Sequence, residues 1–211
     1  MSDQHVIPRH VAYRWLAQFF LCPPDLTTLE SYHSQDGQQF LTGLQSTPAL
    51  DPLAGWLKDA VTHTEDLVSL QAQIARAFTQ TFDMGGPRAA LPYASVYLSA
   101  KGLLFQQPAR DMNALLQRLQ MQLPAEVNEP TDHLGVQLHV AAELIERESL
   151  GQSVPISSTA FLDQQVLSWL AEFVQRCEAL IDRAPIPMLA QAALALAQET
   201  CQAADLCREP M

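Results

Sequence analysis

The sequence predicts an all-α protein, a compact bundle of about eight or nine helices. Apolar residues recur at the spacing of a helix along almost the whole chain. No stretch alternates apolar and polar residues for long, and no Asn-Gly or Asp-Gly turn joins two such stretches. Glycine is scarce, at 8 of 211 residues, whereas Ala, Leu and Gln are abundant, and this composition favours helix over sheet.

Proline and capping residues set the expected limits of the helices. The first apolar stripe stops at Leu21, because Pro23 and Pro24 cannot continue a helix. Asp51 followed by Pro52 is typical of an N-cap and a first helical residue, so another helix is expected from there to residue 60. The remaining apolar stripes predict helices over residues 67–82, 96–105, 112–119, 130–149, 158–181 and 187–207.

A break in the helical pattern divides the chain into two parts. Residues 122–130 contain Pro124, and Pro130 biases the residue before it towards an extended backbone. We predict that this segment is a hinge between an N-terminal helical part, 1–121, and a C-terminal helical part, 131–211. Neither part alone would bury a good core, so we expect each to complete the other. The same arrangement allows the C-terminal helices to cross into a second copy, giving a domain-swapped homodimer.

The balance of charge bears on the class of partner. With 12 basic and 23 acidic side chains, the chain has a formal net charge of −11. Nucleic acid is not expected as a partner, because phosphate binding needs clustered Lys and Arg, whereas a basic partner is compatible with this charge. The chain begins without a basic region and apolar stretch, and its longest apolar run, 188–197, is too short to span a membrane. These features predict a cytoplasmic protein without membrane insertion.

No set of residues predicts catalysis or metal binding. The four cysteines form no Cys-x-x-Cys pair, which argues against zinc and favours free thiols in a reducing compartment. His139 and Glu143 lie four residues apart on one predicted helix, but a di-iron bundle needs Glu-x-x-His twice, and the sequence does not supply that pair. Phosphate-binding glycine motifs are missing as well. A metal- or nucleotide-dependent helical enzyme is therefore the weaker hypothesis, and a purely structural oligomerisation module is weaker still.

The most distinctive segment is Asn-Glu-Pro-Thr-Asp-His-Leu-Gly, residues 128–135. Helix capping explains part of it. Glu129 would be the cap, Pro130 the first helical residue, and Asp132 a first-turn acid that complements the helix dipole. Capping does not explain His133. An imidazole beside a carboxylate, at an exposed helix start next to a hinge, can instead hydrogen-bond a ligand or peptide, and both interpretations stay open.

A second distinctive segment, Leu-Pro-Tyr-Ala-Ser-Val-Tyr, covers residues 91–97. In one interpretation Ser95 caps a helix, while Tyr93 and Tyr97, four residues apart, pack on one helical face. In the other, two tyrosines and a serine on one turn form a recognition surface, in which the rings make apolar contacts and the hydroxyls bind the backbone of a guest. The residues themselves favour neither interpretation.

Acidic residues are concentrated next to the predicted hinge. Six lie between residues 126 and 148, against one basic residue, Arg147. A solvated helix face is the ordinary explanation for such a run. Alternatively, an acidic rim beside an apolar groove would suit a peptide that carries both arginine and a hydrophobic stretch.

Segments 91–97 and 128–134 resemble those of the TorD/DmsD/NarJ family of molybdoenzyme maturation chaperones. Residues 15–20 in the first helix and 172–177 in a late helix agree as well. The resemblance runs over most of the chain in the same order, and it is best to the branch that serves trimethylamine N-oxide reductase. Its most specific part is the Glu-Pro-x-Asp-His motif at a mid-chain hinge.

The resemblance implies an all-helical cytoplasmic chaperone and not an enzyme. Such proteins bind the twin-arginine signal peptide and the core of an apo-molybdoenzyme, here trimethylamine N-oxide reductase. They assist insertion of the molybdenum cofactor and prevent premature export. The chaperone itself is expected to need no cofactor, although weak GTP binding is implied for some relatives. The residues that the resemblance assigns to signal-peptide and client binding are Tyr93, Ser95, Tyr97, Glu129, Pro130, Asp132, His133 and Gln137.

Gly135 departs from what a helix favours. Glycine inside a helix is less stable than alanine by about 1 kcal/mol. Gly135 therefore either loosens the start of its helix or lets another helix approach closely, and the sequence alone does not separate the two explanations.

Overall fold

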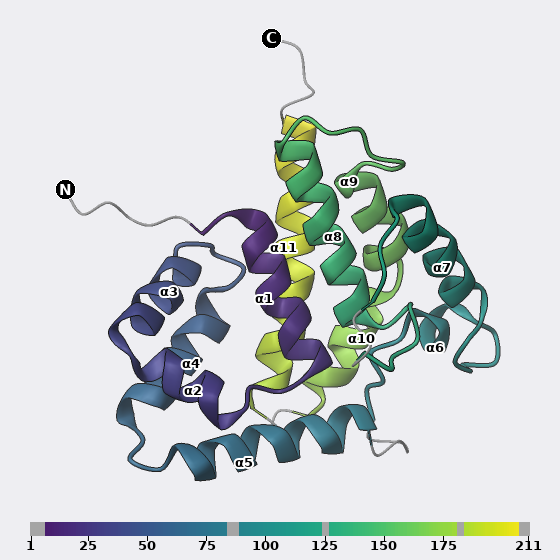
Figure 1. Cartoon of the computed structure of the whole chain (residues 1–211). Coiled ribbons are helices and arrows are strands. Elements are labelled where there is room, and N and C mark those ends of the chain that lie inside the picture. The colour runs from purple at the N-terminus through teal and green to yellow at the C-terminus, as the bar shows by residue number, and fades with distance from the viewer. Residues whose placement is uncertain (1–6, 84–88, 124–126, 181–183, 207–211) are drawn as a thin grey trace.

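The computed structural model describes residues 7–83, 89–123, 127–180 and 184–206. Within these ranges the chain is helical and forms no β-strand, only a single bridge between two residues outside the helices. The prediction of an all-α fold is confirmed (Figure 1). The helices in chain order are α1 (Arg9–Leu21), α2 (Leu26–His33), α3 (Gln35–Gln45), α4 (Asp51–His63), α5 (Leu67–Phe78), α6 (Ala94–Leu98), α7 (Gln107–Leu119), α8 (Leu134–Ser149), α9 (Ser158–Phe161), α10 (Ser168–Glu178) and α11 (Ile186–Leu206), with π-helical turns η1 (Thr79–Asp83) and η2 (Leu162–Leu167).

Several limits lie where proline and capping residues predict them. α1 ends at Leu21, directly before the turn that contains the two prolines. α4 begins at Asp51 with Pro52 in its first turn, one residue earlier than predicted, because Leu50 occupies the cap position. α11 covers the predicted C-terminal helix as far as the described residues extend.

The helix predicted over residues 96–105 is wrong in both limits. In its place α6 begins at Ala94 and ends at Leu98. Gly102 and Phe105 have positive φ angles, of 60° and 59°, which a right-handed helix does not allow. The chain therefore continues from α6 as a loop until α7 begins.

Two short helices, α2 and α3, add to the predicted set. Each has a capping residue at its start: Asp25 accepts a hydrogen bond from the backbone N–H of Thr28, and Ser34 from that of Gly37. Their apolar faces are narrow, since Leu29 is the buried residue of α2. Capping signals are present in the sequence here, but a strong apolar stripe is not.

α1 and α8 pack along each other at the centre of the molecule, with α11 beside them (Figure 1). The hydroxyl of Tyr13 in α1 donates to the backbone oxygen of Leu196 in α11 at 3.2 Å. Fully buried side chains such as Leu16 in α1 and Leu138 in α8 belong to one hydrophobic cluster. The two predicted parts of the chain thus share a core, while the hinge and the domain swap stay predictions. Residues 124–126 of that hinge lie outside the described ranges.

Gly135 allows the close contact between α1 and α8. A β-carbon at Gly135 would lie 2.7 Å from Cγ of Leu21 and 2.9 Å from the backbone oxygen of Ala17. Contacts shorter than 3.0 Å force the neighbouring atoms to shift. Of the two explanations offered for this glycine, close approach of another helix is the one that the structure supports.

Gly135→Ala is expected to destabilise the protein by about 2 kcal/mol, because the added methyl group overpacks the contact between α1 and α8. Gly55→Ala is the matched control. Gly55 lies inside α4, and its β-carbon would meet only the end of the Gln45 side chain, at 3.2 Å. There the better helix propensity of alanine should preserve or raise stability. Urea unfolding followed by circular dichroism measures the free energy of unfolding of both variants. An equal change in the two variants would contradict the close-approach explanation.

Candidate functional site

Two segments that are far apart in the sequence meet at one place, which we call the junction. It consists of residues 92–97, which contain the start of α6, and residues 129–137, which contain the start of α8. Tyr93 and His133 form an antiparallel bridge between the segments. All eight residues predicted to bind a client belong to these two segments, so the fold brings together what the sequence separates.

Backbone hydrogen bonds join the two segments on either side of this bridge. The N–H of Leu134, the first residue of α8, donates to the oxygen of Pro92 at 2.8 Å. The N–H of Ala94, the first residue of α6, donates to the oxygen of Asp132 at 3.1 Å. The first N–H groups of a helix have no partner inside the helix. At the junction, the segment before α6 therefore supplies an acceptor for the start of α8, and the segment before α8 supplies an acceptor for the start of α6.

Asp132 caps α6 and not α8. Its Oδ2 accepts a hydrogen bond at 2.7 Å from the backbone N–H of Ser95, which lies 37 residues earlier in the chain. The carboxyl group is fully buried, and no described residue donates to its Oδ1. The prediction that Asp132 lies in the first turn of α8 is wrong. An acid at a helix start is nevertheless favourable, and here the helix is α6.

His133 is the N-cap of α8. Its Nδ1 accepts the N–H of Gly135 at 3.1 Å, so the ring carries its proton on Nε2. The residue is only 3% exposed, and burial lowers the pKa of the imidazole to about 3, which keeps it neutral at physiological pH. The sequence predicted an exposed helix start, but His133 at the start of α8 is buried. The assignments of Glu129 as cap and Pro130 as first helical residue are wrong as well, because α8 begins only after His133.

Tyr93 and Glu129 lie at the half-exposed edge of the junction. The Tyr93 hydroxyl donates to Oε2 of Glu129 at 2.7 Å. Its ring stands edge-on to that of His133, with the ring centroids 5.0 Å apart. Pro130 is also half-exposed, and its backbone oxygen accepts the N–H of His133 at 2.9 Å. Solvent, and hence a guest, reaches Tyr93, Glu129 and Pro130.

Tyr97 covers an aromatic cluster at the end of α6. Its ring stacks on Trp169 of α10 with centroids 5.2 Å apart, and the guanidinium carbon of Arg176 lies 4.5 Å from its ring centroid. Gln137 of α8 holds the same tryptophan, because its Oε1 accepts the indole N–H at 3.2 Å and its amide donates to the oxygen of Gln165 at 3.1 Å. Gln137 is fully buried, so it positions Trp169 and is not itself exposed.

Ser95 connects the junction to the loop after α6. It is fully buried, and its Oγ accepts the N–H of Gln106 at 3.1 Å, so the prediction that it caps the helix is wrong. The end of α6 and the loop after it expose a group of large apolar side chains, which we call the apolar loop surface: Leu98 is 47% exposed, Leu103 54% and Phe105 66%.

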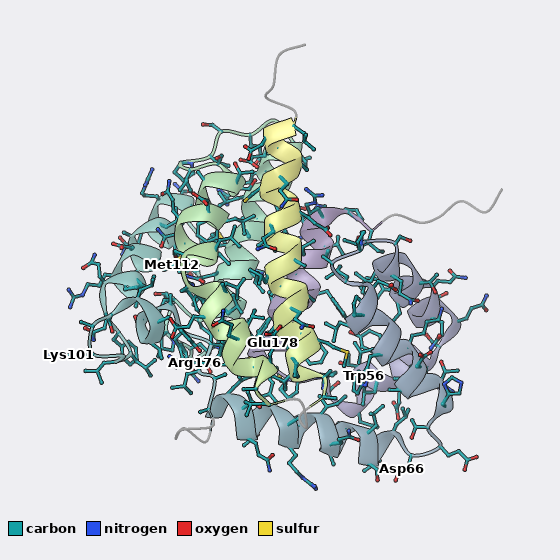
Figure 2. All side chains as sticks on the ribbon, turned by 180° about the vertical axis from the view of Figure 1, so that it is seen from behind. Trp56, Asp66, Lys101, Met112, Arg176 and Glu178 are labelled. Carbon is teal, nitrogen blue, oxygen red and sulfur yellow. The ribbon has the colours of Figure 1, made fainter. Side chains whose placement is uncertain are left out.

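This surface was not predicted from the sequence, although Gly102 followed by three apolar residues is a visible signal of it. Phe105 combines high exposure with a positive φ, which is unfavourable for a bulky residue. The backbone thus holds an aromatic ring in solvent at the expense of local strain. Figure 2 shows Lys101 of this loop and Arg176 of α10 on the same side of the molecule.

Comparison with known proteins identifies the family. Residues 46–175, which include both segments of the junction, match the family model described as nitrate reductase delta subunit. The chain is 35% identical to Chaperone protein TorD of Vibrio vulnificus (strain YJ016) over 170 residues, 78% of this chain and 79% of that protein. It is 31% identical to Chaperone protein TorD of Photobacterium profundum over 180 residues, 81% of this chain and 82% of that protein. The chain belongs to the TorD/NarJ family.

The predicted resemblance to the TorD/NarJ family is thereby confirmed. A further relative, from Vibrio cholerae serotype O1 (strain ATCC 39315 / El Tor Inaba N16961), is 33% identical over 171 residues, which are 78% of this chain and 77% of that protein. These relatives are named as chaperones and not as enzymes. Their names support the prediction that this member of the family is not an enzyme.

In this TorD-family chain, the acidic residues of α8 already have partners. Arg14 of α1 forms ion pairs with Glu143, at 3.5 Å, and with Glu146. Arg147 donates to Glu143 at 2.7 Å. Glu148 accepts the N–H of the first residue of α9 at 2.8 Å. These three glutamates therefore connect α8 to its neighbours, while an acidic rim beside a groove stays a hypothesis.

In the part of the TorD-family chain that the structure describes, no three His, Cys, Asp or Glu side chains gather so that they could hold a metal ion. Nor is any helix there both long and apolar enough to cross a bilayer. The described cysteines, Cys22, Cys177 and Cys201, are free thiols.

Proposed function

We propose that this chain is a cytoplasmic chaperone for an apo-molybdoenzyme, trimethylamine N-oxide reductase. It binds the twin-arginine signal peptide and the core of that client, assists insertion of the molybdenum cofactor and prevents premature export. The observation that carries the proposal is the junction, where the two segments that resemble the binding motifs of the family meet beside an exposed apolar surface. Membership of the family and the names of the TorD relatives support it.

The junction residues divide into two groups by exposure. We assign client contact to the half-exposed group, which is Tyr93, Tyr97, Glu129 and Pro130. The second group is buried and holds the first in position, by capping helices, anchoring the loop or orienting Trp169. Its members are Ser95, Asp132, His133 and Gln137. Changes in the second group would then act on binding through the shape of the junction.

A twin-arginine signal peptide has a basic start followed by an apolar stretch, and the surface at the junction suits both. The Glu129 carboxylate is half-exposed and can accept guanidinium N–H groups. The apolar stretch would cover the apolar loop surface, which begins at Leu98, the residue after Tyr97. Removal of this apolar area from water favours binding by about 25 cal/mol per Å².

Phe105→Asn is expected to weaken binding of a twin-arginine signal peptide about tenfold, because the variant lacks the most exposed ring of the apolar loop surface. Asparagine tolerates a positive φ, so the fold should keep its stability. Leu150→Asn is the matched control: Leu150 is equally exposed, at 66%, but lies at the opposite end of α8 from the junction. Isothermal titration calorimetry measures the affinities. The same loss in both variants would count against the assigned surface.

A twin-lysine version of the peptide tests recognition of the basic start. The wild-type chain should bind the twin-arginine peptide more tightly, since a guanidinium can form two parallel hydrogen bonds to the Glu129 carboxylate and an ammonium cannot. Glu129→Gln should reduce the difference in affinity between the two peptides, because the amide has no charge. If the wild-type chain bound both peptides equally, it would not recognise twin-arginine signals, and the proposal would fail.

A further inference from the structure

A small pocket lies between the C-terminal half of α1, the turn after it and α2, outside the junction. Its volume is about 130 Å³. The aromatic rings of Trp15, Phe19 and Tyr32 form its walls together with the two prolines of the turn, and the exposed thiol of Cys22 lies in the lining. The Trp15 indole N–H donates to the Tyr32 hydroxyl at 2.8 Å, so two of the walls hold each other in place.

Among the described residues that line the pocket, Asp25 is the one that carries a charge, and no Lys, Arg or His accompanies it. The Asp25 side chain is exposed, and its Oδ1 accepts the backbone N–H of Thr28 at 2.8 Å. Hydrogen bonds from the side chain and backbone of Thr28 hold the pKa of this carboxyl below its usual range. The carboxylate is therefore charged at neutral pH, and its exposure to solvent leaves it accessible to a cationic group.

We propose that this pocket binds a basic side chain, arginine or lysine, of a partner peptide. Such a side chain combines an apolar stem with a cationic head. The stem would contact the aromatic and proline walls, while the head reaches the Asp25 carboxylate. An anion finds no cation in the described lining, and a purely apolar guest leaves the carboxylate without a partner. The net charge of −11 steers basic peptides towards the chain.

This pocket is separate from the junction, although both adjoin α1. Ala17 and Leu21 of α1 face Gly135 at the start of α8. Trp15 and Phe19 line the pocket instead. The site therefore does not depend on the proposed function, and its test uses a probe that lacks the apolar stretch of a signal peptide.

The probe is the peptide acetyl-Gly-Arg-Arg-Gly-amide, with citrulline in place of both arginines as the neutral control of the same shape. Alkylation of Cys22 in the purified full-length chain, followed by peptide mapping, reports occupancy of the pocket directly. Cys22, Cys177, Cys201 and Cys207 are far enough apart in the sequence for peptide mapping to report Cys22 separately. We expect the arginine peptide to slow alkylation of Cys22 and the citrulline peptide to leave it unchanged, with protection weakening as salt is raised.

Asp25→Asn should raise the arginine-peptide concentration needed for protection about tenfold, because one charge-assisted contact is lost. Asp66→Asn is the matched control. Asp66 is equally exposed and caps α5 through a bond from Ser69 N–H as Asp25 caps α2, but it does not line the pocket. Protection by citrulline, unchanged protection in Asp25→Asn, an equal loss in Asp66→Asn, or no protection by arginine would each overturn the proposal.

Discussion

The stability of the protein should fall steeply as the pH is lowered from 6.5 towards 3. His133 is neutral in the fold with a pKa of about 3, whereas an unfolded chain gives it the ordinary value of 6.5. Between these two values the unfolded chain binds a proton that the folded chain does not, so acid favours unfolding. From His133 alone, the free energy of unfolding should be about 2.5 kcal/mol smaller at pH 4.5 than at pH 7.

His133→Asn isolates this effect. Asparagine is a favourable N-cap, and its side-chain oxygen can accept the Gly135 N–H in place of Nδ1 without titrating. Urea unfolding at a series of pH values gives the slope for each protein. The difference between wild type and variant removes the contribution of other groups, including His139, whose pKa is also lowered by burial. Parallel profiles would mean that His133 is not held neutral by its surroundings.

Asp132→Ala is expected to destabilise the protein by about 3 kcal/mol, since it leaves the buried N–H of Ser95 without an acceptor and removes the cap of α6. Asp132→Asn keeps an oxygen for that bond and should lose roughly 1 kcal/mol. Thermal and urea unfolding measure both variants. α6 carries part of the proposed client surface, so these variants should also bind the peptide less tightly. The loss of affinity should follow the loss of stability, with Asp132→Ala affected more than Asp132→Asn.

Asp66→Ala is the control for a cap in solvent. Asp66 accepts the N–H of Ser69 at 3.0 Å at the start of α5, in the same way that Asp132 accepts that of Ser95. Asp66 is exposed, however, so water can replace its carboxylate. Asp66→Ala should therefore lower the free energy of unfolding much less than Asp132→Ala does. If the two alanine variants lost the same stability, burial of the Asp132 bond would not contribute.

Local patterns predicted the limits of a helix best where it has one buried stripe and a clear end. This holds for α1, with prolines after Leu21, and for α11. It fails at residues 96–105, because pattern analysis assumes that recurring apolar side chains face a core, whereas Leu103 and Phe105 face solvent. The positive φ of Phe105 is a property of the folded chain that no spacing reveals.

The candidate site shows the same division between local and long-range information. The sequence identified Asp132, His133 and Ser95 as unusual, and all three belong to the junction. It did not predict that Asp132 caps α6, that His133 caps α8 or that Ser95 holds the loop after α6. The partner of Asp132 lies 37 residues away, and exposure of His133 was inferred from its position at a helix start. Long-range pairing and burial depend on the tertiary structure and leave no mark in sequence spacing.

The exchange of acceptors at the junction makes two distant helix starts a single cooperative unit. The first N–H of α8 depends on Pro92, and the first two of α6 depend on Asp132. If the start of one helix unfolds, the start of the other loses its hydrogen-bond acceptors. We therefore expect the two helix starts to open together. The amide protons of Ala94, Ser95 and Leu134 should accordingly exchange with solvent through one shared event. A chaperone built this way would present its client surface as either fully formed or absent.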